Sequence, residues 1–387
     1  MVGGFPKTVV ESQVLAHVRD MSEAGINMDV WSIVNTRKEY INGQKTLSAF
    51  HKSFPAVNVR LFRGVRPGLP FSEVLNAFLF LWWMWRLDTK PAFVHARTEH
   101  AAMIAAIAKR IKNYRLIWDA RGDTLSEFKE YAQHLPPYRK LLAPLIRNRI
   151  SKYLTAANGQ CDAAIFVSEE LRRLDGKNLP IEKTIIVPCV ADESLFFFDP
   201  QLREHSRAFL GYGENDVVLA YVGSTASWQC VPETIALMEQ AIRANASIKV
   251  LIVTPDRDVF QAAFPTDLRD RVRITSGSLD EMNRYLNTAD FGMLLRKSTP
   301  VNKVASPVKF AEYSLAGLTV VTTDAVEQVK EIGRRLGNTI EASEFMKVYV
   351  QGNRRPANRI DIAMKARAAL GRKSHMGKLI ELYSFYR

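Results

Sequence analysis

Cysteine is scarce in this chain, and its distribution excludes two common ways of stabilising a fold. Three cysteines occur among 387 residues, Cys161, Cys189 and Cys230, and they lie far apart. An odd number at such spacing provides neither a disulfide framework nor a zinc-binding motif. Proteins without structural disulfides are typical of a reducing compartment, so we expect a cytoplasmic protein.

Long hydrophobic runs are also missing. Met1 to Thr8 lacks the basic segment and apolar stretch of a secretory signal. The apolar run Ala77–Trp85 is far shorter than the roughly 20 residues that a membrane-spanning helix needs. We predict a buried helix there. The alternative is an interfacial helix, because tryptophans suit the headgroup boundary and a basic residue follows. These residues are Trp82, Trp83, Trp85 and Arg86.

Acidic residues are outnumbered by basic ones. Lys and Arg total 53 against 40 Asp and Glu, which gives a net charge of +13. The excess is spread along the chain, so it indicates either an ordinary solvated surface or anionic partners. No nucleic-acid module or basic stripe with interleaved aromatics occurs, and we expect no nucleic-acid partner. Nucleotide phosphates are the favoured partners, and an anionic membrane surface is a further expected one.

Several ligand-binding motifs are absent. No G-x-G-x-x-G lies between a strand and a helix and no P-loop occurs, which argues against dinucleotide and P-loop readings. No Asp-x-Asp pair or His, Cys and carboxylate cluster has metal-binding spacing, so we expect no metal and no cofactor. Asp256 and Asp258 form Asp-Arg-Asp, but that segment is predicted to be a surface turn.

Strands rich in Val and Ile alternate with helical segments, which predicts parallel sheets covered by helices on both faces. The predicted strands are 28–34, 91–96, 115–120, 162–168, 184–188, 217–223, 248–254, 271–275, 290–295 and 318–323. The predicted helices are 9–24, 101–111, 138–158, 169–174, 232–244, 279–287 and 309–316. Because the pattern restarts midway, the fold class is α/β with two doubly wound Rossmann-like domains.

The domain boundaries follow from that restart. We predict a first domain over 1–190, a linker over 191–207 without strand pattern, and a second domain over 208–359. A basic helix over 360–387 is expected to cross back and join the first domain. Only Met1 and Val2 precede Gly3-Gly4, so either the first strand is very short or the chain lacks residues natural to its start.

The segment 305–324 carries the strongest chemical signal. Ser306 is predicted to cap a helix and Pro307 to occupy its first position. The free N–H groups at such a helix start suit a diphosphate. Glu312, two turns in, could accept hydrogen bonds from ribose hydroxyls, and Gly317 ends the helix before the next strand. An ordinary βα unit with a solvated Glu312 is the alternative.

This segment resembles the donor-binding region of GT-B glycosyltransferases, most nearly those of family 4 that build surface polysaccharides. The pattern is S-P-x-K-F-x-E-Y-x-x-x-G-L-x-V-V, preceded by DFGMLLRKST. Weaker matching pieces run over most of the chain in the same order. The resemblance implies two domains facing a cleft, with a nucleotide-diphosphate sugar held by the second domain and the acceptor by the first. It also implies retention of anomeric configuration.

The resemblance assigns roles to residues of the second domain. Glu312 would bind the ribose, while the helix start would present backbone to the diphosphate. Arg296 would lie beside the departing phosphate, and Lys309 would do the same or face solvent. The predicted donor-binding residues are Gly223, Ser224, Arg296, Ser306, Pro307, Val308, Lys309 and Glu312. Of these, Arg296 and Lys309 are also predicted to be catalytic, together with Asp119 of the first domain.

Two departures from the family pattern bear on activity. Relatives often carry an Arg and a Lys after the first strand of the second domain, where this chain has STASWQC. Relatives also often carry a second Glu before the ribose Glu, and here Val304 occupies that place. Arg296, with Lys297 or Lys303, must then supply the positive charge; the alternative is that Arg296 is an ordinary surface residue.

The first half offers candidates for acceptor or sugar contacts after its predicted strands. The alternatives are that Asp119 caps the following turn and that His95 is a structural residue. Gly3 and Gly4 resemble the glycine loop through which relatives bring donor and acceptor close to the backbone. The candidates are Gly3, Gly4, His95, Arg97, Glu99, Asp119 and Arg121.

The sequence thus predicts a metal-independent glycosyltransferase of bacterial polysaccharide or glycoconjugate synthesis, with a saccharide or lipid-linked acceptor. It would be cytoplasmic, with peripheral contact at the inner face of the cell membrane as a further expectation. The alternatives are a non-catalytic GT-B module that binds a nucleotide sugar or a partner enzyme, and an epimerase of the same fold. The sequence gives neither the nucleotide base, the sugar, the linkage nor the oligomeric state.

Overall fold

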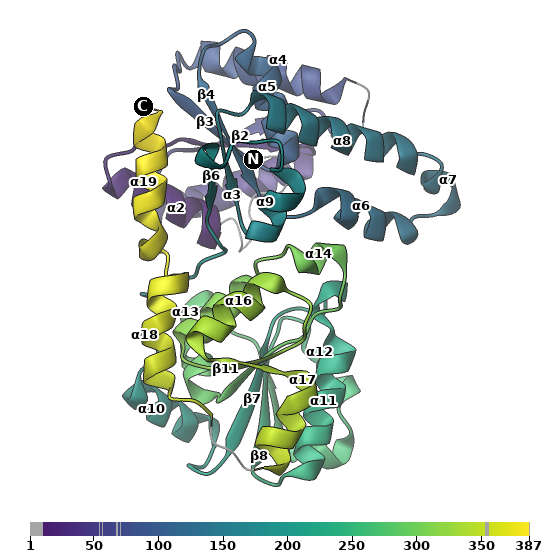
Figure 1. Ribbon diagram of the computed structural model, residues 1–387, viewed down its shortest axis with the longest axis vertical. Helices are drawn as coiled ribbons and strands as arrows, with labels where there is room; N and C mark the ends of the chain where they lie inside the picture. The colour runs from purple at the N-terminus through teal and green to yellow at the C-terminus, as the bar shows by residue number, and fades with distance from the viewer. Residues whose placement is uncertain are drawn as a thin grey trace. The chain divides into compact units, whose positions relative to one another are not determined.

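The computed structural model describes residues 11–53, 55, 57–66, 69, 71–352 and 356–386. The chain divides into two compact units. The first unit comprises Met1–Pro188 and His375–Arg387, and the second comprises Cys189–Ser374. Each unit contains parallel β-structure covered by helices (Figure 1). Each unit also has its own apolar core.

The first unit contains two parallel sheets. Strands β1 (Val30–Val34) and β2 (Val59–Arg63) form a two-stranded sheet. The second sheet has four parallel strands in sequence order. These strands are β3 (Phe93–Arg97), β4 (Arg115–Ala120), β5 (Ala163–Phe166) and β6 (Thr184–Ile186). Every residue of β5 is buried, as expected for a strand with both faces covered.

Helices cover the first unit, and some of them begin at side-chain caps. Asp123 caps one helix by accepting from the Ser126 amide, and Ser168 caps another by accepting from the Leu171 amide. The helices are α2 (Ala16–Glu23), α3 (Arg37–Ser53), α4 (Ser72–Arg86), α5 (Glu99–Lys109), α6 (Thr124–Gln133), α7 (Pro137–Lys140), α8 (Ala143–Gln160), α9 (Glu169–Asp175) and α19 (Met376–Phe385).

The second unit is built on one six-stranded parallel sheet in the order β12-β11-β10-β7-β8-β9. Its strands are β7 (Val217–Val222), β8 (Ile248–Val253), β9 (Val272–Thr275), β10 (Phe291–Leu294), β11 (Thr319–Thr322) and β12 (Thr339–Glu341). The chain runs outward from β7 to one edge and then from β10 to the other. This is the strand order of a doubly wound Rossmann-like sheet, with its switch point between β7 and β10.

Both faces of this sheet are covered because successive side chains of each strand point to opposite sides. Val218 and Ala220 of β7 join one apolar cluster, while Leu219 and Tyr221 join the other. Helices of the first cluster are α10 (Pro200–Leu210), α13 (Leu279–Thr288), α15 (Val308–Leu315), α16 (Glu327–Leu336) and α18 (Arg359–Leu370). Helices of the second are α11 (Val231–Ala244), α12 (Arg257–Ala263) and α17 (Ala342–Phe345).

The predicted fold class of two doubly wound α/β domains is confirmed, but several boundaries differ. Helix α10 starts at the cap Asp199 and packs on α13, so much of the predicted linker belongs to the second unit. The predicted tail helix is two helices. Helix α18 packs on α15 in the second unit, whereas α19 belongs to the first unit. Strands β2 and β12 were not predicted, because their short runs contain charged residues.

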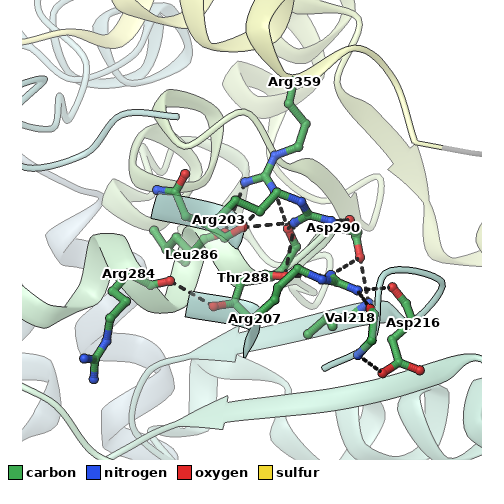
Figure 2. A network of polar contacts seen from close by, with 12 residues as sticks. Arg203, Arg207, Asp216, Val218, Arg284, Leu286, Thr288, Asp290 and Arg359 are labelled. Carbon is green, nitrogen blue, oxygen red and sulfur yellow. Dashed lines mark hydrogen bonds and ion pairs between the residues drawn. The ribbon is translucent and has the colours of Figure 1, made fainter. Parts of the chain in front are cut away.

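Three arginines bind the carboxyl end of α13, as Figure 2 shows. Arg203 donates to three carbonyls at that end, and Arg359 donates to four carbonyls, two of which it shares with Arg203. Arg207 donates to the Thr288 carbonyl. Asp290 accepts from Arg203 at 2.6 Å and from Arg207 at 3.4 Å. The positive charges complement the partial negative charge of a helix carboxyl end and anchor α10 and α18.

The prediction of a buried helix over Ala77–Trp85 is wrong for one side of α4. Ala77 and Met84 are buried, but Phe78, Trp82 and Trp85 are exposed. The reason is that Ser72, Glu73 and Asn76, which precede the run, are buried and turn the opposite side of the helix outward.

Candidate functional site

The predicted donor residues gather at the carboxyl edge of the six-stranded sheet. Gly223 and Ser224 directly follow β7, Arg296 follows β10 by one residue, and α15 begins near the same edge. Ligands of doubly wound sheets bind outside the carboxyl ends of the strands, beside the switch point. The fold of the second unit therefore brings these segments, up to 90 residues apart in sequence, to one place.

Arg296 is a buried cation at this edge, with 8% of its surface exposed. Its Nη1 donates to the Leu295 carbonyl at 2.8 Å. Its backbone is fixed by Thr323 after β11, whose hydroxyl accepts from the Arg296 amide and donates to its carbonyl. Within the described part of the chain it forms no ion pair with a carboxylate. Burial lowers the pKa of the guanidinium, while Cys230 and Tyr221 oppose that shift.

The surroundings of Arg296 show how it could replace the Arg and Lys that relatives often carry after the first strand of the second domain. Two of the groups acting on its charge, Tyr221 and Cys230, flank the loop where relatives carry an Arg and a Lys. Arg296 therefore brings a positive charge close to that loop from the neighbouring strand. Lys297 is directed elsewhere and pairs with Glu233 of α11 at 3.2 Å. Lys303 is exposed at the end of α14 (Pro300–Lys303).

The loop after β7 is held by two side chains. The Tyr221 hydroxyl donates to the Ser224 carbonyl at 2.6 Å, and the Thr225 amide and hydroxyl donate to the Asp256 carboxylate at 2.7 and 3.0 Å. A Cβ at Gly223 would lie 3.2 Å from the Tyr221 hydroxyl, a tight contact. The prediction of a surface turn at Asp256 and Asp258 is wrong in part: Asp258 is exposed but lies in α12, and the half-buried Asp256 shapes the predicted donor loop.

Helix α15 begins one residue later than predicted, at Val308, with Pro307 in the cap position. The prediction that Ser306 caps it is wrong, since the Ser306 hydroxyl accepts from the Cys189 amide at 2.8 Å. Gly317 follows the helix with φ of +73°, and the Leu318 amide donates to the Tyr313 carbonyl, so the predicted helix end is confirmed. The free amides of the first turn still point out of the helix start.

Glu312 lies on α15 and is 7% exposed. Its Oε2 accepts from Lys309 Nζ at 2.7 Å, one turn earlier on the helix. The alternative of a freely solvated Glu312 is therefore wrong. Lys309 neither stands free nor points into open solvent, because it fixes this carboxylate. Val304, where relatives often carry a second Glu, is buried.

In the first unit, Asp119 is the centre of an ion cluster at the ends of β3 and β4. Its carboxylate lies 3.2 Å from His95 Nε2, 3.2 Å from Arg97 Nη1 and 3.3 Å from Arg121 Nη1. It is 2% exposed. Burial opposes ionisation, but Arg121, His95 and Arg97 outweigh it and lower the pKa of Asp119. The alternative that Asp119 caps the next turn is wrong, because Asp123 is the cap.

Three further residues complete this cluster, and the sequence did not reveal them. Gln13 Oε1 accepts from Arg97 at 2.8 Å and from Arg121 at 2.9 Å. The Tyr383 hydroxyl of α19 lies 2.8 Å from His95 Nδ1 and 3.0 Å from His17 Nε2. Burial first, and then His95, lower the pKa of His17 to about 3, so His17 is neutral. No local sequence pattern marks these residues, because they reach the ends of β3 and β4 only through tertiary packing.

Carboxylates crowd together beside this ion cluster. Glu99 is 3% exposed; one carboxylate oxygen accepts from the Thr124 hydroxyl at 2.7 Å, and the other has no hydrogen-bond partner among the described residues. Burial, together with Glu99 and Asp123, raises the pKa of Asp175 to about 7. Burial and the same two neighbours raise the pKa of Glu127 to about 7. The candidate contact Glu99 therefore belongs to a group of four acids.

Gly3 and Gly4, predicted to contact donor or acceptor, lie outside the described residues. Among the residues that the structure describes, no group of three or more His, Cys, Asp or Glu side chains is arranged to hold a metal ion.

Comparison with known proteins identifies the fold. No model of a protein family matches the chain, and no curated protein matches it in sequence. Solved structures match nearly all of it. HepE from Anabaena, in complex with UDP, is 15% identical with a TM-score of 0.70, covering 99% of this chain and 98% of HepE. Sucrose-phosphate synthase from Thermosynechococcus elongatus is 14% identical with a TM-score of 0.67, covering 96% and 92%.

A third match is WaaB, a galactosyltransferase of the lipopolysaccharide outer core. It is 11% identical with a TM-score of 0.66, and the match covers 99% of this chain and 97% of WaaB. This chain therefore has the GT-B fold, and the predicted likeness to GT-B proteins is confirmed at the level of fold.

Proposed function

We propose that this protein is a glycosyltransferase that moves a sugar from a nucleotide-diphosphate donor to a saccharide or lipid-linked acceptor. The donor would occupy the carboxyl edge of the six-stranded sheet. The solved HepE structures contain UDP, UDP with glucose, or UDP-glucose, so a UDP-sugar is the first donor to test. The family resemblance supports retention of configuration and a role in bacterial polysaccharide or glycoconjugate synthesis in the cytoplasm.

Arg296 is the observation that carries the proposal. A guanidinium that is 8% exposed and has no carboxylate partner in the described chain is costly unless an anion completes its environment. It stands where the loops after β7 and β10 meet the start of α15, a position suited to phosphate. When the bond between sugar and diphosphate breaks, negative charge grows on the leaving oxygen. Arg296 would stabilise that charge in a water-poor site.

Glu312 would bind the nucleoside. Lys309 fixes one carboxylate oxygen. The ribose hydroxyls would donate hydrogen bonds to the carboxylate, which a charged acceptor strengthens. The loop Gly223–Ser224 and the backbone of 306–308 would enclose the diphosphate. In the first unit, Arg97 and Arg121 are proposed to contact the sugar or acceptor, and Asp119 to position them.

Calorimetry with UDP, GDP and dTDP tests the donor site. We expect one nucleotide to bind the wild type, Arg296→Ala to weaken its binding at least about tenfold, and Glu312→Gln to weaken it by about tenfold, equivalent to ~1.4 kcal/mol. Arg269→Ala and Glu344→Gln are matched controls, because both side chains are exposed in the second unit. Unchanged affinity in Arg296→Ala and Glu312→Gln, with both folded, would contradict the proposed site.

Transfer itself needs a separate measurement. We expect release of nucleotide from a matching UDP-sugar, in the presence of acceptor, to fall about 10²-fold or more in Arg296→Ala. We also propose that no metal ion takes part, so EDTA is expected to leave the rate unchanged. Loss of activity in EDTA that Mg²⁺ or Mn²⁺ restores would contradict that part.

A non-catalytic nucleotide-sugar-binding module is the second candidate. Buried Val304 in place of a second carboxylate, and Asp119 enclosed by cations of its own unit, favour it. The two candidates separate in one experiment. Donor binding without donor cleavage across a panel of saccharide and lipid-linked acceptors supports the module and contradicts the enzyme.

A further inference from the structure

Helix α4 carries its polar side chains inward and its apolar ones outward. Ser72 and Asn76 are fully buried, and Glu73 is 7% exposed. A stripe of large apolar side chains instead faces out along one side of the helix, at helical spacing. This outer stripe comprises Phe71, Val74, Leu75, Phe78, Trp82 and Trp85. Phe78 is 57% exposed and Trp85 is 73% exposed.

Buried polar contacts fix this orientation. Glu73 accepts from Arg149 at 2.6 and 2.8 Å and from the Tyr153 hydroxyl. Asn76 exchanges two hydrogen bonds with the backbone of Val65, at 2.8 and 2.9 Å. Turning the helix to bury the stripe would break all these contacts and leave buried polar groups unpaired. The outward stripe is therefore a fixed property of the fold.

The charge beside the stripe is predominantly positive, although the exposed Asp88 follows the end of α4. Residues 74–87 contain no Asp or Glu, and Arg86 stacks over Trp82 at 5.5 Å. Arg149 also donates to the Leu69 carbonyl, which ties the start of α4 to α8 one turn from exposed Leu145. Residues 135–161 likewise contain no acid. Their exposed side chains include Tyr138, Arg139, Lys140, Leu141, Leu142, Leu145 and Arg147.

The geometry points to an anionic phospholipid bilayer as the occupant of the outer stripe. Aromatic and aliphatic side chains beside exposed arginine and lysine match the headgroup region of such a bilayer, where tryptophan is favoured. Helix α4 is about 22 Å long, so it would lie in the membrane plane. None of the helices in the described chain is long and apolar enough to cross a bilayer. A second copy fits poorly, because its own basic rim would face this one.

Figure 1 shows α4 and α8 at the periphery of the first unit, where α4 is packed on α5 and thus supported from beneath. A surface on this unit would hold the protein beside lipid-linked molecules. This consequence rests on the proposed function, in which the acceptor is lipid-linked. The docking itself depends only on the stripe and its basic rim.

Cosedimentation of the full-length protein with vesicles tests the inference. We expect binding to phosphatidylglycerol–phosphatidylcholine vesicles, at least about tenfold weaker binding to phosphatidylcholine alone, and weakening as NaCl rises from about 50 to 500 mM. Phe78→Ser/Trp85→Ser is expected to reduce binding to anionic vesicles at least about tenfold. Phe209→Ser/Val259→Ser removes two exposed apolar side chains from the second unit and is expected to change it less than about twofold.

Nucleotide binding by the same samples keeps the outcomes distinct. A Phe78→Ser/Trp85→Ser protein that keeps both unfolding transitions of the wild type and binds UDP like the wild type is folded in both units. If that variant also binds vesicles like the wild type, or if the wild type binds none, the docking inference is overturned while the proposed function stands. If the wild type binds vesicles but no nucleotide, the docking inference stands while the proposed function is overturned. A wild-type dimer that this variant dissociates assigns the stripe to a second copy and also overturns the inference.

Discussion

At the scale of single residues, charge burial sets the chemistry of both units. Arg296 is a cation without a carboxylate partner in the described chain, whereas Asp119 is an anion surrounded by Arg97, Arg121 and His95. An enclosed carboxylate is a poor candidate for direct attack or proton transfer, but it orients the side chains around it. The two arginines, each about one-fifth exposed, are therefore the accessible groups of that cluster.

Asp175 gives a pH-dependent prediction. Its folded pKa of about 7, raised by burial and by Glu99 and Asp123, exceeds the unfolded value of about 4. The folded state therefore holds a proton that the unfolded state releases, and stability is lost as pH rises from about 4 through 7. Asp175→Asn removes this loss. We expect its melting temperature to exceed that of the wild type by about 3 °C or more at pH 8.

The comparison at pH 4.5 provides the control, because Asp175 is protonated there and the variant should melt close to the wild type. Asp258→Asn, at an exposed site, should show no pH-dependent difference. A gain that is equal at both pH values would contradict the raised pKa.

Tyr383 gives a prediction about the ion cluster of the first unit. Its hydroxyl lies between His17 and His95 and is fully buried. Tyr383→Phe keeps the ring, which stacks on Phe93 at 5.0 Å, but leaves both imidazoles without this partner. We expect a loss of about 1–3 kcal/mol in the free energy of unfolding. Urea denaturation measures it, with Tyr131→Phe as an exposed control; equal loss in both would contradict a role for the hydroxyl.

At the scale of elements, helix ends are anchored by buried side chains. Two of the three arginines at the end of α13, Arg203 and Arg207, share the carboxylate of Asp290, which is 7% exposed and also accepts from the Val218 amide at 2.8 Å. Burial lowers the pKa of Arg359 to about 9. Removing the charge of Asp290 would leave the arginines mutually repelling in a dry environment, with Asp216 acting on Arg207 alone among them in the contacts described.

Asp290→Asn should therefore be severely destabilising. We expect a loss of about 3–5 kcal/mol, typical of breaking a buried ion pair, and a fall in melting temperature of roughly 6–20 °C. Differential scanning calorimetry measures both. Asp258→Asn again serves as the exposed control, and a shift of Asp290→Asn within the range of that control would show that the carbonyls alone satisfy the arginines.

Strands and helices were predictable where the sequence pattern matches the burial of their side chains. Strand β4 was predicted at its observed bounds because its centre, Leu116 to Trp118, is apolar, and every residue after Arg115 is buried. Helix α4 was misjudged because its hydrophobicity was taken to mean burial. Glu73 and Arg149, 76 residues apart, decide which side turns inward, and no local pattern records that pairing.

At the scale of the whole molecule, two separate cores predict two unfolding events. A nucleotide bound at the edge of the six-stranded sheet should stabilise only the second unit. At a concentration of 100 Kd we expect about 2.7 kcal/mol, and hence a rise of roughly 5–11 °C in one transition. Asp290→Asn should lower that same transition, whereas Tyr383→Phe should lower the other. A shift of the Tyr383-sensitive transition by UDP would place the nucleotide elsewhere.

The sequence by itself determined the fold class, most strands and the identity of the residues worth testing. Apolar periodicity, Gly317 and the motif from Ser306 to Gly317 are local properties, so they can be recognised from the sequence without a structure. Only the tertiary structure decided that Ser306 holds Cys189, that Lys309 holds Glu312, and that Asp119 is enclosed. Tertiary contacts also divided the terminal helices between the units and turned the apolar side of α4 outward. The physical reason is that a hydrogen bond or ion pair requires two groups to lie within contact distance. For groups far apart in sequence, that distance is set only when their segments pack together.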